Sequence, residues 1–313
     1  MADPMIIVCP GQGAQALGMG RVWAETSPEA QAVFDEADQV LGNSLGQTLS
    51  SICFAGPAEV LNRTDVSQPA LYTCAIASWR GLCAQMGHAE GEAPISAAAG
   101  LSLGEYSALH VAGSFSFADG LRLVALRGKA MQNAAEAVPS SMVALVGADE
   151  EQAIAVCDEA RESGILVCAN FNAPGQIVLS GDKDACARAE KVAADKSIRA
   201  VALSVAGAFH SPIMQPAAEA LGKALAGVDI EPPRVPVWSN VTAEPHANDA
   251  GSIRARLAEQ LTSPVRWAQS FAAMVEQHPE SQVHELAPGK TLAGMGKRIS
   301  RSTKVISHDA PEI

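Results

Sequence analysis

Short apolar runs alternate with amphipathic stretches along most of the chain. The run PMIIVCP at 4–10 stops at proline and glycine, and PISAAAG at 94–100 is a second run of small apolar residues; both predict buried strands. Apolar residues at helical spacing predict helices near 27–42, 69–86 and 116–137. Strands and helices therefore alternate as in an α/β protein.

The pattern changes at about Ser140. Strand-like runs and amphipathic stretches then follow in the order β-α-β-β-α-β, which is the split βαβ or ferredoxin-like pattern. The segments are SMVALVG, DEEQAIAVCDEARESG, ILVCAN, QIVLSG, DKDACARAEKVAAD and RAVALSV. This order predicts a small ferredoxin-like subdomain at 139–206, inserted into a larger core formed by 1–138 and 207–313.

After the insert, the alternation of elements resumes. A helix is expected over about 212–226, PVWSNVTAEP at 236–245 predicts a strand and a turn, and QVHELAPG at 282–289 predicts another strand. Further helices are expected near 251–261, 266–277 and 290–300. The fold class predicted is therefore α/β, with a mostly parallel, covered sheet plus the inserted ferredoxin-like subdomain.

The composition allows a large buried core and argues against a nucleic-acid binder. Hydrophobic residues make up 48% of the 313 residues, charged residues make up 18%, and the net charge is −12. Binding of nucleic-acid phosphates needs clustered cations, whereas this chain is acidic overall. Positive charge gathers only near the end, at Lys290, Lys297, Arg298, Arg301 and Lys304. These residues form either a docking surface for an acidic partner or a solvated helix face.

The cysteines and the apolar runs indicate a soluble protein of the cytoplasm. Seven cysteines are scattered without a CxxC pair, so neither a disulfide framework nor a metal site is expected. MIIVCPGQG near the N-terminus is typical of a strand that enters a turn rather than of a signal peptide. No apolar stretch approaches the length of a membrane span.

GLSLGEYSAL at 100–109 contains the strongest candidate for chemistry. Ser102 stands between Gly100 and Gly104, after a predicted strand and before a stretch with helical character. A strand, a GxSxG turn and a helix form the nucleophile elbow, in which glycines permit a strained turn and the helix N-terminus faces the serine. Ser102 is therefore the candidate nucleophile; the alternative is an ordinary glycine-rich loop.

A serine nucleophile needs a general base, and His210 is the best placed of seven histidines. It follows a predicted strand end in SVAGAFHSPIM, where active-site residues of α/β sheets collect; capping or core packing is the alternative. His110 should point away from Ser102, and His284 fits a strand core. The remaining four are expected at the surface: His88, His246, His278 and His308. No acid stands out as a partner for His210, and a backbone carbonyl could orient its ring instead.

Two further features raise binding hypotheses. The loop CPGQGAQALG at 9–18 matches a loose dinucleotide fingerprint, but the acids about 20 residues on, Asp35 and Glu36, fall inside a predicted helix, so the match fails. A free N–H in this loop is a better candidate for an oxyanion donor. Arg127 shares an apolar helix face with Met131, and its guanidinium either pairs with a protein carboxylate or binds a substrate carboxylate.

Eight segments together resemble the malonyl-CoA:acyl-carrier-protein transacylases of fatty-acid synthesis and the acyltransferase domains of polyketide synthases. The segments are PGQGAQALGMG, GLSLGEYSAL, LRLVALRGKAMQ, NFNAPGQIVLSG, VAGAFHSPIM, SNVTAEP, SPVRWAQS and ELAPGKTLAGMGKRI. They follow the family's order and cover nearly the whole chain. The resemblance implies a hydrolase-like α/β core with a ferredoxin-like insert and no cofactor. The activity it implies is transfer of malonyl groups from malonyl-CoA to acyl carrier protein.

The resemblance also implies a role for each matching residue. Ser102 would take the acyl group, and His210 would act as general base and then as acid for the leaving thiol. The backbone amides of Gln12 and Leu103 would form the oxyanion hole, and the backbone carbonyl of Arg266 would orient the histidine. The residues implied in substrate binding are Arg127, which would clasp the malonyl carboxylate, and Met131, Phe209 and Asn172.

Two positions bear on the substrate that the resemblance implies. Phe209, in GAFH, is similar to relatives that use malonyl rather than methylmalonyl groups, because a ring there would crowd a branch methyl. Leu101 departs from the family, since many members carry a histidine before the nucleophile. Some polyketide acyltransferases share the leucine, so fatty-acid and polyketide pathways both stay open.

Rival functions make different predictions. An esterase or thioesterase would use the same elbow with water as acceptor, and would place an acid between Ser102 and His210 in chain order. A non-enzymatic CoA-ester binding protein would leave Ser102 unmodified. The function expected is that of a monomeric, cytoplasmic malonyltransferase, with malonyl-CoA and acyl carrier protein as partners and no nucleic acid or membrane.

Overall fold

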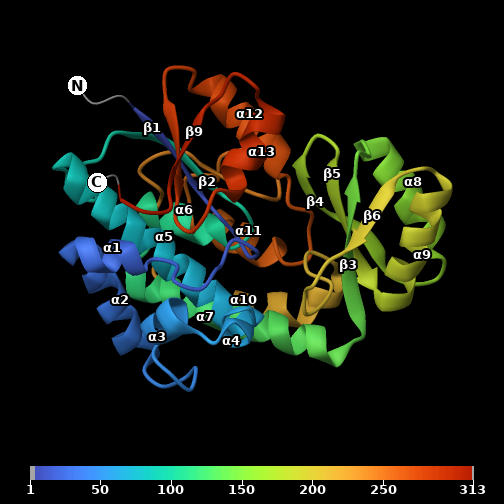
Figure 1. The fold of residues 1–313 in the computed structure, drawn as a ribbon, viewed down its shortest axis with the longest axis horizontal. Coiled ribbons are helices and arrows are strands. Elements are labelled where there is room, and N and C mark those ends of the chain that lie inside the picture. Colours follow the sequence, from blue (N-terminus) through green and yellow to red (C-terminus); the bar gives the residue numbers. More distant parts are fainter. Residues whose placement is uncertain (1–3, 312–313) are drawn as a thin grey trace.

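Two sheets lie side by side along the long axis of the molecule (Figure 1). The computed structural model describes residues 4–311. The larger sheet is parallel, with five strands in the order β7-β2-β1-β8-β9. The smaller sheet is antiparallel, with four strands in the order β4-β5-β3-β6.

The large sheet is built around a fully buried central strand. Its strands are β1 (Met5–Cys9), β2 (Ile95–Gly100), β7 (Val237–Trp238), β8 (Gln282–Leu286) and β9 (Val305–His308). Every residue of β1 is buried because helices cover both faces, as parallel sheets require. The mostly parallel, covered sheet predicted from the sequence is therefore present.

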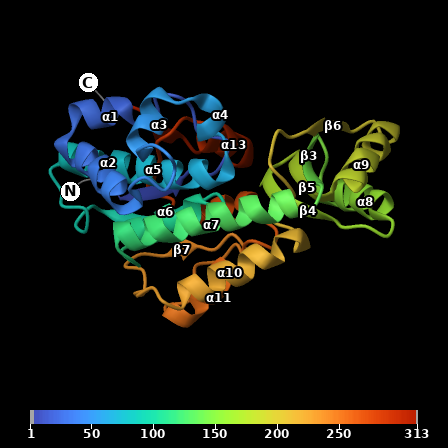
Figure 2. The same cartoon turned by 90° about the horizontal axis from the view of Figure 1, so that it is seen from below.

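Helices enclose both faces of this sheet. On one face, Ile7 of β1 packs in a cluster with the helices of the first half of the chain, and on the other face Ile6 packs with Phe271 of α12. The long α7 runs from beneath the large sheet to the small one, with α10 and α11 beyond it (Figure 2). These helices are α1 (Arg21–Thr26), α2 (Pro28–Leu41), α3 (Leu49–Ala55), α4 (Ala58–Leu61), α5 (Thr64–Met86), α6 (Gly104–Val111), α7 (Phe117–Ala137), α10 (Gln215–Leu225), α11 (Ala250–Glu259), α12 (Trp267–Gln277) and α13 (Thr291–Ile299), with a 3₁₀ turn η1 (Pro212–Met214).

Several boundaries differ from the sequence prediction. α5 begins at Thr64 rather than near Pro69, because burial along nearly the whole helix outweighs the missing N–H of the proline. The short α1, α3 and α4 were not predicted, since they carry too few turns to show periodicity, and neither was β9, a half-buried edge strand of the large sheet.

The small subdomain has the predicted β-α-β-β-α-β order. Its elements are β3 (Ser140–Val146), α8 (Glu150–Arg161), β4 (Leu166–Ala173), β5 (Gln176–Asp182), α9 (Lys183–Asp195) and β6 (Arg199–Ala202). Both helices pack on one face of the sheet around their own apolar cluster. The exact borders proposed above, at 139–206, stay a prediction.

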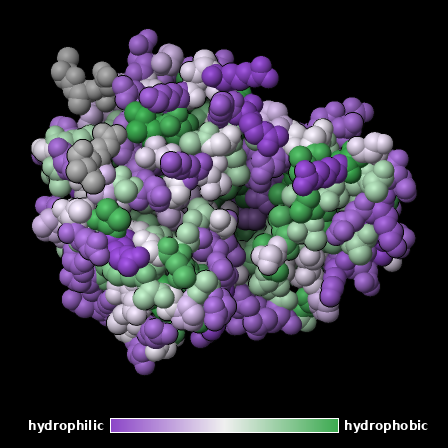
Figure 3. All heavy atoms as spheres, in the orientation of Figure 1, coloured by the Kyte–Doolittle hydropathy of each residue, from purple (hydrophilic) through white to green (hydrophobic). Residues whose placement is uncertain are grey.

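The surface is hollowed between the large sheet and the small subdomain (Figure 3). The hollow leads to a cleft of about 450 Å³ that is lined from both sides. Between residues 4 and 311, none of the helices has both the length and the apolar character that a membrane span needs.

The turn after β2 packs directly against the end of β1. A Cβ on Gly100 would overlap the Gly104 carbonyl group, and a Cβ on Gly104 would overlap the Cys9 carbonyl oxygen. Leu101 N donates to the same Cys9 oxygen at 3.0 Å. Glycine is needed at both positions because backbone occupies the space that a side chain would take.

Gly104→Ala tests this close packing. The new methyl group would meet rigid backbone, so we expect the free energy of unfolding to fall by about 3 kcal/mol. The control is Gly222→Ala in α10, where the nearest atom to a new Cβ is Ala258 Cβ at 4.0 Å. The control should leave stability unchanged or raise it by about 0.5–1 kcal/mol. Urea unfolding measures both, and equal midpoints for the two variants would contradict the packing argument.

Candidate active site

Ser102 stands at the tip of a sharp turn between β2 and α6. Its backbone is left-handed, with φ of 52°, a conformation that is costly for a residue with a side chain. The side chain of Asn240 stabilises the turn: its Oδ1 accepts from Ser102 N at 2.6 Å, and its Nδ2 donates to Gly100 O at 2.7 Å. These bonds hold the Ser102 hydroxyl at the cleft, as the elbow motif predicted.

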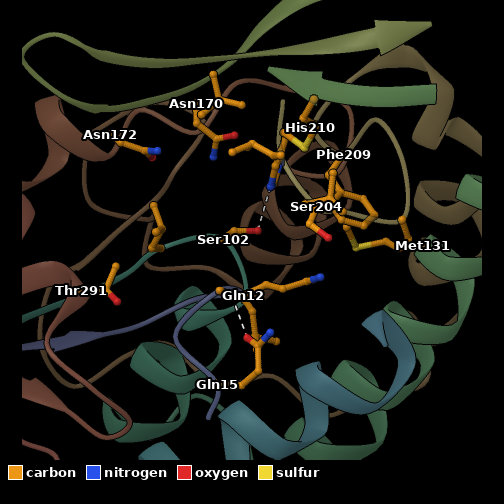
Figure 4. A pocket seen from close by; sticks show the side chains of 18 of the residues that line it. Gln12, Gln15, Ser102, Met131, Asn170, Asn172, Ser204, Phe209, His210 and Thr291 are labelled. Atoms are coloured by element: carbon orange, nitrogen blue, oxygen red, sulfur yellow. Dashed lines mark hydrogen bonds between the residues drawn. The ribbon is translucent and has the colours of Figure 1, made fainter. Parts of the chain in front are cut away.

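His210 lies directly against this hydroxyl (Figure 4). Ser102 Oγ and His210 Nε2 are 2.8 Å apart, and His210 Nδ1 is 2.8 Å from the carbonyl oxygen of Gln260. A carbonyl can only accept, so Nδ1 carries the ring proton and Nε2 is left to accept the serine proton. His210 also has a left-handed backbone, with φ of 56°.

Burial controls the protonation of this base. The pKa of His210 is lowered to about 4, mainly because the ring is removed from water and also because the Arg127 guanidinium lies nearby. The carbonyls of Gln260 and Ser263 act against this shift by accepting from the ring. The imidazole is therefore unprotonated at neutral pH, the form that a general base requires.

Arg127 of α7 reaches the nucleophile from below the cleft. Its Nη2 donates to Ser102 Oγ at 3.0 Å and to Gln260 Oε1 at 2.9 Å, and its Nη1 donates to Gln68 Oε1 at 2.7 Å. The side chain is 1% exposed. Within residues 4–311 no carboxylate forms an ion pair with it. The pairing with a protein acid that the sequence left open is thus absent, and the positive charge stays available to a ligand.

The other expected pocket residues gather around the dyad. Phe209 and Met131 lie on one side of Ser102, and Asn172 of β4 lies on the other (Figure 4). Asn172 is 8% exposed, and its Oδ1 has no hydrogen-bond partner among the described residues. Leu101 also lines the cleft, so the place of the family's usual histidine is apolar here.

The two expected oxyanion donors flank the nucleophile. Gln12, in the loop after β1, and Leu103, just before α6, both line the cleft beside Ser102. In the part of the chain that the structure describes, the backbone N–H of each has no protein acceptor. Two free N–H groups beside a nucleophile are able to bind an oxyanion.

Comparisons with known proteins identify the family of the chain. The family model described as the acyl transferase domain matches residues 6–310. The chain belongs to this acyl transferase family.

Relatives of this acyl transferase are similar over nearly their full length. A malonyl CoA-acyl carrier protein transacylase of Bacillus subtilis is 41% identical over 97% of this chain and 92% of its own. The solved structure of a malonyl-CoA:acyl carrier protein transacylase from Xanthomonas oryzae superposes with a TM-score of 0.91 at 40% identity, covering 99% of this chain and 96% of that one. A type II polyketide-synthase acyl-carrier protein in complex with its malonyl-transacylase gives 0.90 at 37% identity, covering 98% and 96%. The family resemblance and the fold class predicted from the sequence are confirmed.

One expected role in this acyl transferase is wrong. Arg266 was expected to orient His210 through its carbonyl, but Gln260 does so. The Arg266 carbonyl accepts from Ser270 N in the first turn of α12 and is occupied. Gln260 directly follows α11, where carbonyls have no helical partner and remain free to accept. The Arg266 guanidinium instead lies 5.8 Å from the centre of the Phe171 ring.

Two histidines expected at the surface are buried. His308 bonds to His284 at 2.8 Å between ring nitrogens, and His246 bonds through Nε2 to Glu105 Oε1 at 2.7 Å. Their polar local sequence gave no sign of this, because the partners come from distant parts of the chain. His110 lies away from Ser102, as expected, and pairs with Glu90 at 3.1 Å.

Sequence reasoning missed the amides and the acid that support the site. Gln68, Asn240, Gln260 and Glu105 are each 0% exposed. Gln68 bonds to Arg127, Asn240 to Ser102 and Gln260 to His210, while Glu105 bonds to Asn240 and Gln260. No local signal marked them: Gln68, for example, precedes the helix predicted from residue 69 and stands near two other polar residues, Asp65 and Ser67. The described residues contain no group of three or more side chains placed to bind a metal ion.

The low pKa of His210 predicts an unusual pH profile for this acyl transferase. His210 acts as base only when unprotonated, so activity is lost as pH falls through its pKa of about 4 rather than through 6.5, the ordinary value. We expect kcat/KM for acyl transfer to stay level from about pH 8 to about pH 5. Circular dichroism at each pH shows where the chain remains folded, and an acid limb near 6.5 in folded protein would contradict the assignment.

Proposed function

We propose that this protein transfers the malonyl group of malonyl-CoA to the phosphopantetheine thiol of acyl carrier protein, through a malonyl ester of Ser102. The observation that carries the proposal is the position of Arg127. A buried guanidinium without an acidic partner lies 3.0 Å from the nucleophile, where it suits an acyl group that ends in a carboxylate.

The first half-reaction loads the enzyme. His210 Nε2 takes the Ser102 hydroxyl proton as Oγ attacks the thioester carbonyl, and the oxyanion is bound by the N–H groups of Gln12 and Leu103. The C–S bond then breaks, and the protonated His210 gives its proton to the sulfur of the leaving CoA. The product is malonyl-Ser102 and free CoA.

The second half-reaction reverses these roles with another thiol. His210 takes the proton of the phosphopantetheine thiol as its sulfur attacks the ester carbonyl, and Ser102 leaves with the proton that His210 returns. Arg127 fixes the malonyl carboxylate throughout, so the ester carbonyl stays in one orientation for both attacks.

The walls of the cleft support a straight diacid. Phe209 is 5% exposed and Met131 is 2% exposed, and both line the cleft beside the nucleophile. The Phe209 carbonyl accepts from Ser180 Oγ at 2.6 Å, which fixes the backbone of this residue against the small subdomain. A rigid ring beside the acyl chain would crowd the methyl branch of a methylmalonyl group.

The pathway proposed is fatty-acid synthesis, because the chain resembles the malonyl-CoA:acyl-carrier-protein transacylases of that pathway, and the Bacillus subtilis relative is named a malonyl CoA-acyl carrier protein transacylase. The polyketide alternative rests on the similar complex of a type II polyketide-synthase carrier with its malonyl-transacylase. Both use the same chemistry at Ser102. We further propose a cytoplasmic, monomeric enzyme; its seven cysteines are all free thiols, as in a reducing compartment.

A thioester panel tests the function. Malonyl-CoA should leave one malonyl group on the intact protein, and Ser102→Ala should leave none. Arg127→Ala should lower kcat/KM for malonyl-CoA by about 100-fold, because it removes a charge-assisted bidentate contact, and should change the value for acetyl-CoA by less than about tenfold. Intact-mass spectrometry and CoA release measure these quantities.

Each rival has its own outcome in this panel. An unmodified wild-type protein would rule out an acyl-enzyme, and release of malonate faster than transfer to carrier would favour a thioesterase. Equal losses for malonyl-CoA and acetyl-CoA in Arg127→Ala would remove the carboxylate clamp.

We also propose that the carrier binds at the cationic end of α13. Lys297, Arg298 and Arg301 are exposed and together line a hollow beside the cleft. Arg298 is fixed by the Pro174 carbonyl at 2.7 Å and by Gln176 Oε1 at 3.0 Å. An acidic carrier would be attracted to this surface, which lies on the helix that also extends into the cleft.

Charge reversal tests the docking surface. Lys297→Glu combined with Arg301→Glu should raise KM for the carrier about tenfold, with the effect reduced at high salt, while adduct formation from malonyl-CoA stays within about twofold. The control is Lys191→Glu, an exposed lysine of α9 in the small subdomain, which should change neither. An unchanged carrier KM in the double variant would place docking elsewhere.

A further inference from the structure

A buried carboxylate lies directly beneath the nucleophile elbow. Glu105 is in the first turn of α6, three positions after Ser102, and is 0% exposed. Its Oε1 accepts from His246 Nε2 at 2.7 Å, and its Oε2 accepts from Asn240 N at 2.9 Å and from Gln260 Nε2 at 2.8 Å. A buried acid is costly unless its hydrogen bonds are satisfied, and these three are.

The bond to Gln260 fixes which way that amide points. Gln260 Nε2 donates to both Glu105 Oε2 and Ser102 O, the latter at 3.0 Å, so both of its hydrogens are used. The amide therefore cannot flip, and its Oε1 must face Arg127. Without Glu105, one amide hydrogen would lose its acceptor, and the amide would be held less firmly in this orientation.

Gln260 is the one described residue that bonds to the nucleophile, the base and the clamp together. Its backbone carbonyl receives His210 Nδ1, its Oε1 receives Arg127 Nη2, and its Nε2 binds the Ser102 carbonyl. Whatever holds Gln260 in place consequently sets the base and the clamp at the same time.

His246 anchors the carboxylate from the opposite side. It lies in the turn after β7, and its backbone N donates to the Val237 carbonyl at 2.8 Å. The side chains of His246 and Glu105 are both 0% exposed, so water does not compete for the bond. A short hydrogen bond that is shielded from water holds the carboxylate in one orientation.

We propose that Glu105, held by His246, is a positioning residue that locks the Gln260 amide and so fixes His210 and Arg127 in register with Ser102. The inference rests on the proposed function. Glu105 contacts no reacting atom. It acts on the base and the clamp through the Gln260 amide, and its bond to Asn240 N supports the elbow as well.

A double-mutant cycle tests this relay. Glu105→Ala should lower kcat for malonyl transfer about 100-fold, because loss of geometry of about 1 Å has effects of that size, while Glu105→Gln keeps an acceptor oxygen and should stay within about tenfold of wild type. Gln260→Met retains the backbone carbonyl but lacks the amide. Because Glu105 acts on the base and the clamp through that amide, the loss of kcat in the double variant Glu105→Ala/Gln260→Met should be smaller than the product of the two single losses.

The preference for malonyl-CoA over acetyl-CoA is the readout that simple destabilisation would not move. Both Glu105→Ala and Gln260→Met should reduce the ratio of the two kcat/KM values, because both release the guanidinium. The matched control is Glu90→Ala, which breaks the other histidine–glutamate pair of α6, with His110, away from the cleft. It should lower the melting temperature and leave the ratio unchanged.

The outcomes distinguish a failure of this inference from a failure of the proposed function. Losses that multiply in the double variant, or an unchanged substrate ratio in Glu105→Ala, would overturn the relay. If Glu105→Ala does not fold, Glu105→Gln takes its place in the cycle with the same requirement of non-additivity. A wild-type protein that forms no malonyl adduct would instead defeat the proposed function itself.

Discussion

The cleft depends on how closely three stretches of backbone meet beneath Ser102. Gly100 and Gly104 leave no room for a Cβ, and the Cys9 carbonyl fills the space between β1 and α6. This packing forces Ser102 into a left-handed conformation that costs on the order of 1–3 kcal/mol, which the two hydrogen bonds of Asn240 help to offset. In this conformation the Ser102 hydroxyl points away from the sheet and toward His210.

Neutral amides, rather than acids, hold the buried cation of the site. An aspartate or glutamate beside Arg127 would form a bidentate pair and compete with any substrate carboxylate. Gln68 and Gln260 accept hydrogen bonds from the guanidinium yet leave its charge unpaired. The acid that follows along these hydrogen bonds is Glu105. It bonds to Nε2 of Gln260 rather than to the guanidinium. The guanidinium is therefore buried and hydrogen-bonded, but no carboxylate of the described residues is paired with its charge.

Local sequence signals predicted the fold and the nucleophile, but they did not predict the contacts that support the active site. Ser116 accepts from Asp119 N as the N-cap of α7, the helix predicted over 116–137, and Ser102 stands in the turn that its flanking glycines predicted. The carbonyl that orients His210 was assigned to the wrong residue. Which carbonyl is free to accept depends on the residue at which α11 ends. His246 and its partner acid are far apart in sequence, and no local periodicity encodes such a contact.

The clamp and the base also interact through space. The charge of Arg127 is among the causes that lower the pKa of His210, second to burial. A carboxylate bound to that guanidinium would offset its charge, and the field acting on the imidazole would weaken. His210 would then be a stronger base with a diacid in place than with an acetyl group. Substrate choice and proton transfer are therefore coupled, because the group that recognises the acyl chain also contributes to the low pKa of the base.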